Sequence, residues 1–218
     1  MKTIYFVRHG ESVNNAARRF NELQTPLSER GIKQAGEIAE RASKLPIELV
    51  VASTLKRAQQ TAAVVAERIG VKIKSSAFFV EGIQSSRLLG KEVSGPEIME
   101  AHKSYHGNFT VAGYRFEDGE NFDDLKQRAL AGLAYLEGRS EENILVVSHG
   151  FFMWIIAAAA VFGHELTAQE CQGVIRGFDL MENTGITVLT HGAPSHKAVG
   201  EVVSPWQLKV WNDHAHLG

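Results

Sequence analysis

The sequence is poor in three features that mark large classes of proteins: cysteine, long apolar runs and an excess of one charge. Its single cysteine, Cys171, excludes a disulfide within the chain and leaves no thiolate cluster for zinc or iron–sulfur. One cysteine is typical of a reducing compartment, and we expect a cytoplasmic protein. Nothing in the composition calls for a metal or another cofactor, so none is predicted.

Membrane and nucleic-acid partners are both disfavoured by the sequence. The most apolar segment, residues 151–163, is shorter than the roughly 20 residues that span a bilayer. Met1–Val7 is too short for the apolar part of a signal peptide. The formal net charge of −2 supplies no general attraction for nucleic acid or an anionic membrane. Any anion site must therefore be local, and nothing in the sequence predicts an oligomeric state.

Two stretches end an apolar run with a histidine that precedes a glycine. Lys2–Asn15 contains β-branched and aromatic residues that stop at Arg8 and His9, and Asn143–Gly150 repeats the pattern with His149. Such runs predict strands that are covered on both faces of a parallel sheet. Ligands of these sheets bind beyond the carboxyl ends of the strands. An Arg–His pair at that edge, with glycine allowing close approach of the backbone, suits an anion such as phosphate.

Strands alternate with helices along the chain, which predicts one α/β domain over residues 1–218. The expected architecture is a three-layer α/β/α sandwich with a mostly parallel central sheet. Helices are predicted from Ser28 to about Leu45, from Ser53 to about Ile69, over 121–138 and over 151–163. Further strands are predicted over 48–52, 71–79, 174–181, 186–190 and 206–211, with a hairpin through 182–185. Residues 80–116 are too long for an ordinary connection and are expected to form a small inserted cap.

Two charged residues are placed near the same sheet edge by this pattern. Arg57 lies in the first turn of a predicted helix, where the helix dipole favours acidic residues. A grip on an oxyanion explains a cation there better than exposure to solvent does, although solvent exposure is the alternative. Glu81 follows the next predicted strand directly, and a partly buried carboxyl group at that place can donate a proton. An ordinary loop carboxylate fits Glu81 equally well.

A set of motifs follows in one order along nearly the whole chain. It consists of Arg-His-Gly-Glu-Ser at 8–12 with Asn15, Pro-Leu-Ser at 26–28, Ser53 to Thr61 with Arg57, Gly119–Glu120, and Ser-His-Gly at 148–150. This set resembles the histidine phosphatase superfamily, which is also called phosphoglycerate mutase-like. Residues 81–91 depart from the run that mutase-like members carry, so the resemblance favours the phosphatase branch.

The resemblance implies a phosphohistidine mechanism that needs no metal. His9 is implied as the nucleophile, and Glu81 stands where the family carries its proton donor. The residues implied to bind the phosphate are Arg8, Asn15, Arg57, His149 and the backbone N–H of Gly150. Phosphoryl transfer depends mainly on positioning and on electrostatic stabilisation, which such a cluster of donors supplies.

The function expected from these residues is hydrolysis of a small phosphate monoester through a phosphohistidine on His9. The alternatives are a cofactor-dependent phosphoglycerate mutase, and a protein phosphohistidine phosphatase or phosphate-binding module. Arg87 and Lys91 are candidates for contact with a second anionic group of the substrate. The aromatic residues of the cap form either a wall of the site or a small core of the cap itself; they are Tyr105, Phe109, Tyr114 and Phe116. His102 and His106 have the spacing of two metal ligands on one helix, but without a third ligand a metal site is disfavoured.

Overall fold

The structure is a computed structural model that describes residues 1–192 and 204–218. The strands are β1 (Lys2–Arg8), β2 (Leu49–Ser53), β3 (Ile73–Ser76), β4 (Asn143–Ser148), β5 (Ile186–His191) and β6 (Trp206–Asp213). The helices are α1 (Val13–Ala16), α2 (Glu29–Ala42), α3 (Lys56–Ile69), α4 (Pro96–Gly107), α5 (Phe122–Glu137), α6 (Gly150–Phe162) and α7 (Ala168–Gly177). The described residues form one six-stranded sheet in the order β3-β2-β4-β1-β5-β6.

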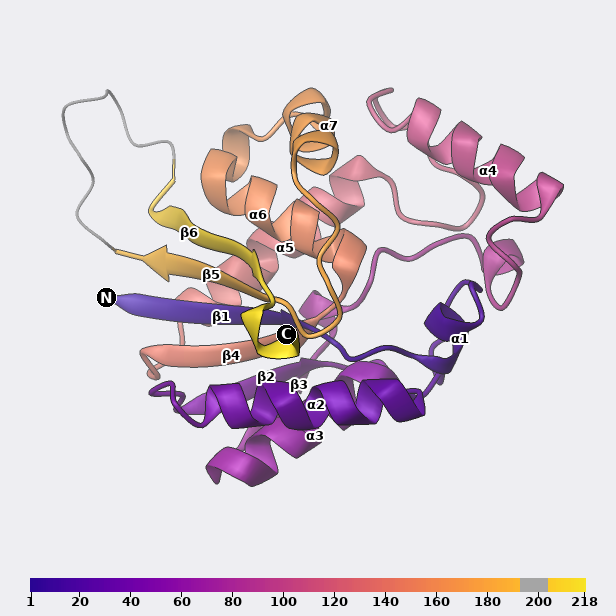
Figure 1. The fold of residues 1–218 in the computed structure, drawn as a ribbon. Coiled ribbons are helices and arrows are strands. Elements are labelled where there is room, and N and C mark those ends of the chain that lie inside the picture. Colours follow the sequence, from indigo (N-terminus) through magenta and orange to yellow (C-terminus); the bar gives the residue numbers. More distant parts are fainter. Residues whose placement is uncertain (193–203) are drawn as a thin grey trace.

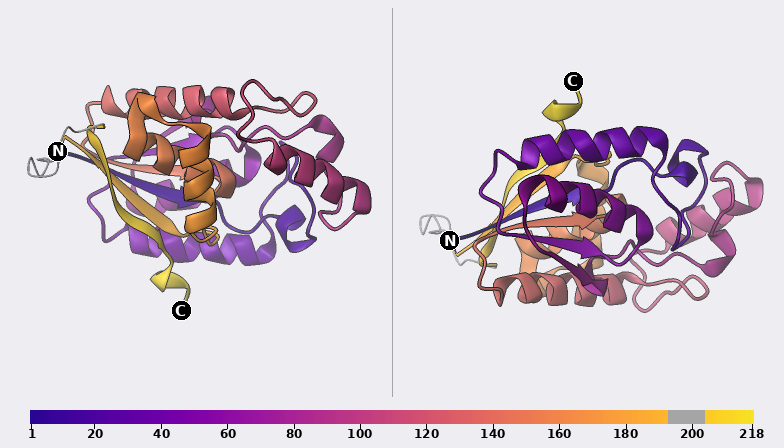
Figure 2. Two further views of the ribbon diagram at one scale, coloured as in Figure 1. Left: turned by 90° about the horizontal axis from the view of Figure 1, so that it is seen from above. Right: turned by 90° about the horizontal axis from the view of Figure 1, so that it is seen from below.

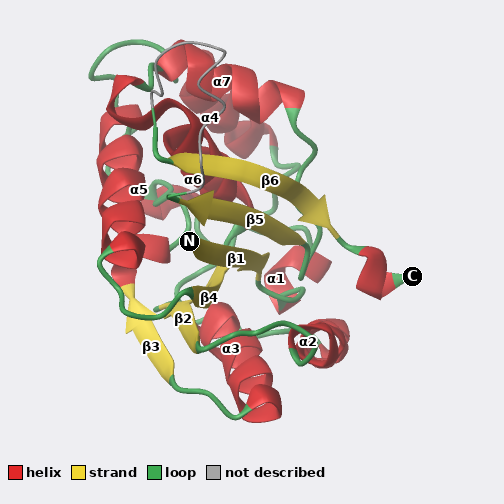
Figure 3. Cartoon of the chain, turned by 90° about the vertical axis from the view of Figure 1, so that its left-hand side faces the viewer, coloured by secondary structure: helices red, strands yellow, loops and turns green. Residues whose placement is uncertain are grey.

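Helices cover both faces of this sheet. The helices α2 and α3 lie on one face, and α5, α6 and α7 lie on the other (Figures 1 and 3). The strands β3, β2, β4 and β1 pair in parallel, whereas β5 pairs antiparallel with β1 and β6. The predicted α/β/α sandwich with a mostly parallel sheet is confirmed.

The register of the two central strands fixes the place of both histidines. In the parallel pair of β1 and β4, Arg8 lies opposite Ser148, so His9 and His149 follow neighbouring strands at the same edge. Both strands are apolar because helices cover them on both faces, and Ile4, Phe6, Ile144 and Val146 are fully buried. Beyond this edge lie α1 and α4, as both views of Figure 2 show.

Several local predictions were wrong. The strand predicted over residues 174–181 is absent: 174–177 form the end of α7, whose start is fixed by a capping box between Thr167 and Glu170, and 178–181 lie in the loop that follows. The predicted hairpin through 182–185 is therefore absent, and β5 pairs instead with β1 and β6 among the described strands. The strand predicted over 71–79 is shorter, because a 3₁₀ turn over Ala77–Phe79 follows β3.

The predicted helix starts were correct for two helices and wrong for a third. Ser28 accepts the N–H of Gly31 as the N-cap of α2, and Asn121 forms a capping box with Asp124 at the start of α5. The start predicted at Ser53 is wrong, because Ser53 ends β2 and the N-cap of α3 is Leu55, whose side chain makes no capping bond.

Residues 80–116 contain a 3₁₀ turn over Ser86–Leu88 and the helix α4. Leu88, Ile98 and Ala101 form a small buried cluster there, against which Phe20 and Phe116 pack. Phe109 instead joins the main core beside Phe122. Phe109 and Phe116 thus serve packing, while the cap as a unit stays a prediction. No helix in residues 1–192 or 204–218 is long and apolar enough to cross a membrane.

Candidate active site

The backbone around His9 is held from four sides at the end of β1. The N–H of His9 donates to the carbonyl of Ser148 at 3.0 Å, and its carbonyl accepts from Asn183 Nδ2 at 2.8 Å. The N–H of Gly10 donates to Thr61 Oγ1 at 3.1 Å. A Cβ at Gly10 would lie 2.5 Å from the carbonyl oxygen of Gly31, so only glycine fits this close crossing of two backbones.

The imidazole of His9 is buried and its two nitrogens have different partners. The Nδ1 atom lies 2.6 Å from the carbonyl oxygen of Gly10, which can only accept, so Nδ1 carries the proton. The Nε2 atom therefore keeps its lone pair, and it accepts from Arg57 Nε at 3.1 Å. Burial, followed by the charges of Arg57 and Arg8, holds the pKa of His9 well below its usual range. A neutral imidazole with its lone pair on Nε2 is the state that a nucleophile requires.

Arg57 is a buried cation in the first turn of α3, with 2% of its surface exposed. Besides His9, its Nη1 donates to the carbonyl oxygen of Glu22 at 3.2 Å. Burial lowers the pKa of Arg57 to about 10, against a smaller opposing effect of Glu81. The guanidinium therefore stays charged at neutral pH. Its position excludes the alternative of a solvated surface residue.

His149 lies beside His9, with the two ring centroids 5.0 Å apart. Ser53 Oγ accepts the N–H of Leu55 and lies 2.8 Å from His149 Nε2, to which it can donate its own hydrogen. The neutral ring then carries its proton on Nδ1, a buried atom without a hydrogen-bond partner among the described residues. Burial, then the charges of Arg57 and its neighbours, holds the pKa of His149 well below its usual range. His149 is thus a neutral donor with a free N–H.

Arg8 supplies a second free donor. Its Nη1 donates to the carbonyl of Met181, but its buried Nε has no hydrogen-bond partner among the described residues. Burial lowers the pKa of Arg8, although Glu81 and Glu182 oppose this effect. A Cβ at Gly150 would lie 3.3 Å from Arg8 Nε, so glycine at the start of α6 leaves room for the guanidinium.

These atoms together form a site for a tetrahedral anion. Buried donors without partners are costly, at about 1–3 kcal/mol each, unless a ligand or water satisfies them. Arg8 Nε and His149 Nδ1 are two such donors, and they accompany the Arg57 guanidinium around one imidazole. A phosphate group offers several acceptor oxygens and a charge that suits both arginines.

Glu81 lies at the N-terminus of α6. Its Oε1 accepts from the N–H groups of Phe152 at 2.9 Å and of Gly82 at 3.0 Å. Within the described residues Oε2 accepts no hydrogen bond, and the side chain lines the cleft described next. Glu81 also acts electrostatically on Arg8 and Arg57, which places its carboxylate near both. The carboxylate is therefore fixed by one oxygen, while the other is available.

A cleft of about 640 Å³ opens beside Arg57 and Glu81. Asn15 also lines the cleft. Its Oδ1 accepts the N–H of Ser12 in a capping box, so its Nδ2 is available to donate to another group. The apolar residues that line the cleft are Phe20, Leu23, Leu55, Ala77, Val80, Ile83, Leu89, Val93 and Phe151. Its volume falls within the range of about 300–1,000 Å³ that is usual for sites of small ligands.

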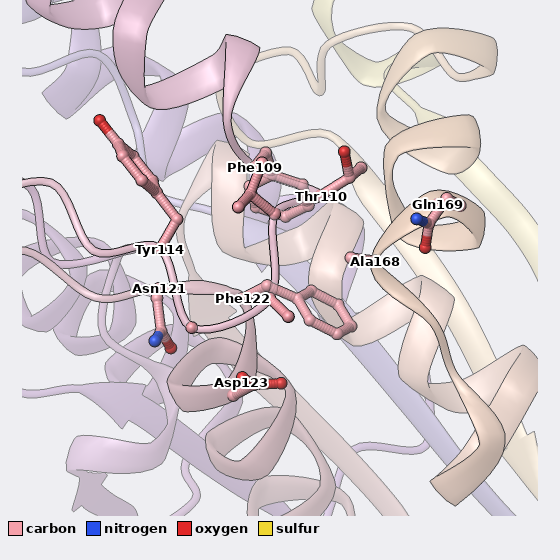
Figure 4. Close-up of a pocket in the computed structure, with 11 residues that line it drawn as sticks. Phe109, Thr110, Tyr114, Asn121, Phe122, Asp123, Ala168 and Gln169 are labelled. Carbon is pink, nitrogen blue, oxygen red and sulfur yellow. The ribbon is translucent and has the colours of Figure 1, made fainter.

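A second cavity, of about 730 Å³, adjoins the cleft, because Asn15, Arg19 and Val93 line both. Its other lining residues include Arg18, Lys103, His102 and His106, and the two histidines are joined by a 3.1 Å hydrogen bond between their Nε2 atoms. Burial lowers the pKa of His106 to about 4. Among the described residues, no third His, Cys, Asp or Glu joins them in a metal-binding group. Figure 4 shows a smaller cavity, of about 260 Å³, between Phe109, Tyr114, Phe122 and Gln169; none of the predicted site residues lines it.

Two candidates for substrate contact lie outside the cleft, and some contacts within the site were not predicted. Arg87 forms ion pairs with Glu97 and Glu117, and neither it nor Lys91 lines the cleft. Conversely, the sequence did not predict that Ser53 orients His149 or that Asn183 holds the backbone of His9. Ser53 ends β2 at the same sheet edge as His149, which is the one feature that pointed to its contact, whereas Asn183 lies in the loop between α7 and β5 and had no such signal.

The fold and the paired histidines make up a site whose geometry suits phosphoryl transfer. The model of the histidine phosphatase superfamily (branch 1) matches residues 4–201, and the chain belongs to this superfamily. The resemblance predicted from the motifs is confirmed. The superfamily contains phosphatases and mutases, so the protein is a phosphoryl-transfer enzyme.

Relatives and solved structures carry names from both kinds of enzyme. A protein of Citrobacter koseri named "Probable phosphoglycerate mutase GpmB" is 36% identical over 155 residues, 69% of this chain and 70% of that one. The Yersinia pestis (strain Pestoides F) protein of the same name is 34% identical over the same shares. A mycobacterial glucosyl-3-phosphoglycerate phosphatase in complex with VO3 has a TM-score of 0.77 at 24% identity, covering 98% of this chain and all of its own. Phosphoserine phosphatase of Entamoeba histolytica has the same TM-score at 21% identity, with both chains fully covered. At these identities the solved structures show a shared fold.

Proposed function

We propose that the protein is a phosphomonoesterase that hydrolyses a small phosphate ester through a phosphohistidine on His9, without a metal ion. The observation that carries this proposal is the state of His9: Nδ1–H is bound to a carbonyl, and the Nε2 lone pair is surrounded by donors. In the first step Nε2 attacks phosphorus, and the bond from phosphorus to the ester oxygen breaks. Glu81, protonated, gives its proton to that oxygen, which leaves as an alcohol.

The second step returns the enzyme to its starting state. Water attacks phosphorus, the carboxylate of Glu81 takes a proton from the water, and the P–N bond breaks with its electron pair returning to Nε2. During both steps the phosphate oxygens replace His9 as the acceptor for Arg57 and satisfy Arg8 Nε and His149 Nδ1. Asn15 and the N–H of Gly150 are the further phosphate donors in this proposal.

The acid role of Glu81 is supported by its geometry. The two N–H groups that bind Oε1 fix the side chain, and Oε2 is available toward the cleft. A proton on Oε2 would face the cleft, where we place the organic group of the ester.

A phosphoglycerate mutase is the second candidate, because the relatives at 34–36% identity carry that name. A mutase holds its phosphoryl group until an acceptor returns, and its substrate carries a carboxylate besides the phosphate. Among the described residues, the cations that line the cleft are Arg57 and Arg19, which already have partners, so the cleft offers little to such a carboxylate, and this favours the phosphatase.

Hydrolysis of p-nitrophenyl phosphate in the presence of EDTA tests the proposal. We expect nitrophenol and inorganic phosphate in equal amounts, at a rate that EDTA does not change and that His9→Ala abolishes. Conversion of 3-phosphoglycerate to 2-phosphoglycerate with a bisphosphate primer, without release of inorganic phosphate, would contradict it and establish the mutase.

A further inference from the structure

The cleft carries a group of exposed, large apolar side chains among its polar ones. Leu23, Ile83 and Val93 line it, and their exposed fractions are 62%, 53% and 43%. Large apolar side chains that are exposed singly need no explanation, but a group of them around one cleft indicates a binding surface. This group directly adjoins Arg57 and Glu81, so its natural occupant is the organic part of the substrate.

The charges in the cleft disfavour an anionic organic group. Among the described residues that line it, the cations are Arg57, which contacts His9, and Arg19, which lies 3.6 Å from Glu92 in an ion pair. Glu22 and Glu81 add negative charge on the same surface. A carboxylate or second phosphate placed beside Leu23 and Ile83 would lose water and meet only these two paired cations on the described lining of the cleft, whereas Arg18 and Lys103 line the adjoining cavity.

The apolar surface lies on the leaving-group side of the phosphate site. Ile83 is two residues from Glu81, whose free oxygen is the proposed proton donor to the ester oxygen. A Cβ at Gly82 would lie 2.7 Å from Cδ1 of Phe151, so glycine lets this segment press against the Phe151 ring. We therefore expect the organic group on the ester oxygen to contact Ile83 and Phe151, which line the cleft together with Glu81.

We propose that the substrates are phosphate monoesters of bulky, uncharged and largely apolar alcohols, whose organic group packs against Leu23, Ile83, Val93 and Phe151. This inference rests on the proposed phosphatase activity and names its substrate class. The cleft, at about 640 Å³, has room for an organic group much larger than that of phosphoglycerate.

A series of n-alkyl phosphates tests the inference, because ethyl, butyl and hexyl phosphate have alcohols of nearly equal acidity. Differences in kcat/KM then report binding of the chain in the transition state. We expect kcat/KM to rise about two- to fourfold for each added CH₂, since a fully buried CH₂ contributes about 0.8 kcal/mol, or roughly fourfold. We expect 3-phosphoglycerate to be hydrolysed at least about tenfold less efficiently than butyl phosphate.

A pair of matched variants separates this cleft from general effects on the protein. Ile83→Ser should lower kcat/KM for hexyl phosphate by about fivefold and that for ethyl phosphate by less than about twofold. Ile32→Ser is the control, because Ile32 is 55% exposed, close to the 53% of Ile83, but lies on α2 outside the cleft. Serine and isoleucine have similar helix propensities, so the control should leave both rates unchanged.

The outcomes distinguish the inference from the function on which it rests. If kcat/KM does not change with chain length while ethyl phosphate is hydrolysed, the apolar substrate class is wrong and the phosphatase stands. A preference for 3-phosphoglycerate over hexyl phosphate, or equal losses in Ile83→Ser and Ile32→Ser, also overturns the substrate class. If no ester is hydrolysed and none phosphorylates the protein, the proposed function fails and the inference fails with it.

Discussion

Replacing Arg57 with alanine removes the cation that contacts the proposed nucleophile. In the wild type its Nε lies 3.1 Å from His9 Nε2, and its Nη1 is bound to the carbonyl of Glu22. The substitution deletes a donor that would bind the transferring phosphoryl group. It also removes one of the positive charges that hold the pKa of His9 low.

The magnitude follows from comparable donors in other active sites. Loss of one fixed oxyanion donor costs about 10²–10³ in kcat, or roughly 2.7–4 kcal/mol. We expect Arg57→Ala to fall in this range, and Arg57→Lys to recover part of the loss, because lysine restores the charge but not the fork of donors. Because Arg57 opposes protonation of His9, its removal raises the pKa of His9, and the acid limb of the pH profile should move toward neutral pH.

The assay is the pH dependence of kcat/KM with p-nitrophenyl phosphate for the wild type and both variants. Arg68→Ala is the control: Arg68 lies on the same helix, is 52% exposed and pairs with Glu40. We expect its activity to match the wild type. A loss of less than about threefold in Arg57→Ala, or an unmoved acid limb, would refute the role of Arg57 in binding the transferring group.

Three further predictions concern Glu81 as the proton donor, the effect of the buried histidines on stability, and the need for a metal. Glu81→Gln should slow alkyl phosphates more than p-nitrophenyl phosphate, because nitrophenolate leaves without a proton; equal losses would remove Glu81 from the acid role. In the folded protein, burial keeps His9 and His149 neutral, whereas in the unfolded chain both take up protons below a pH of about 6.5. The unfolded state then binds more protons, so the free energy of unfolding falls as the pH drops through that value. Urea unfolding from pH 7.5 to 5.5 should show a total fall in stability of about 1.4 kcal/mol per histidine, and a smaller fall in His149→Phe; equal falls would contradict this. Dialysis against EDTA should leave kcat unchanged, whereas a loss that Mg²⁺ or Zn²⁺ restores would show that the mechanism needs a metal.

The sheet and the paired histidines could be predicted because the decisive information is local. The β-branched run before Arg8 and the one before His149 each predict a strand, and each motif follows its strand directly. Parallel pairing then brings both motifs to one edge, as the register of Arg8 and Ser148 shows. Arg57 was predicted for a similar reason, since it stands at a fixed distance from the end of β2.

The errors came where a neighbouring element overrode the local pattern. Residues 174–181 look like a strand because of Val174 and Ile175, yet Thr167 and Glu170 start a helix that runs through both. The capping box was visible in the sequence and carried more information than β-branching did. Ile32 fits the apolar spacing of α2 but is 55% exposed, because Gly31 and Gln34 occupy the buried face beside it.

The cleft could not be predicted, because it depends on contacts between distant segments. Leu23, Val80 and Phe151 come from three parts of the chain that meet only after the sheet has formed. The unpaired donors Arg8 Nε and His149 Nδ1 also depend on packing, because each is buried where no neighbouring group in the described part of the chain accepts its hydrogen bond. Arg87 shows the converse: its charge suggested a substrate contact, but Glu97 and Glu117 neutralise it.

Trapping a phosphoryl group on His9 tests the central claim most directly. The enzyme is mixed with p-nitrophenyl phosphate, quenched within milliseconds in alkali, and digested for mass spectrometry, with His9→Ala treated in parallel. The account predicts an acid-labile phosphoryl group on the peptide that contains His9, formed at least as fast as the enzyme turns over and absent from His9→Ala. Full turnover by the wild type with no such adduct, or an adduct on another residue, would contradict it.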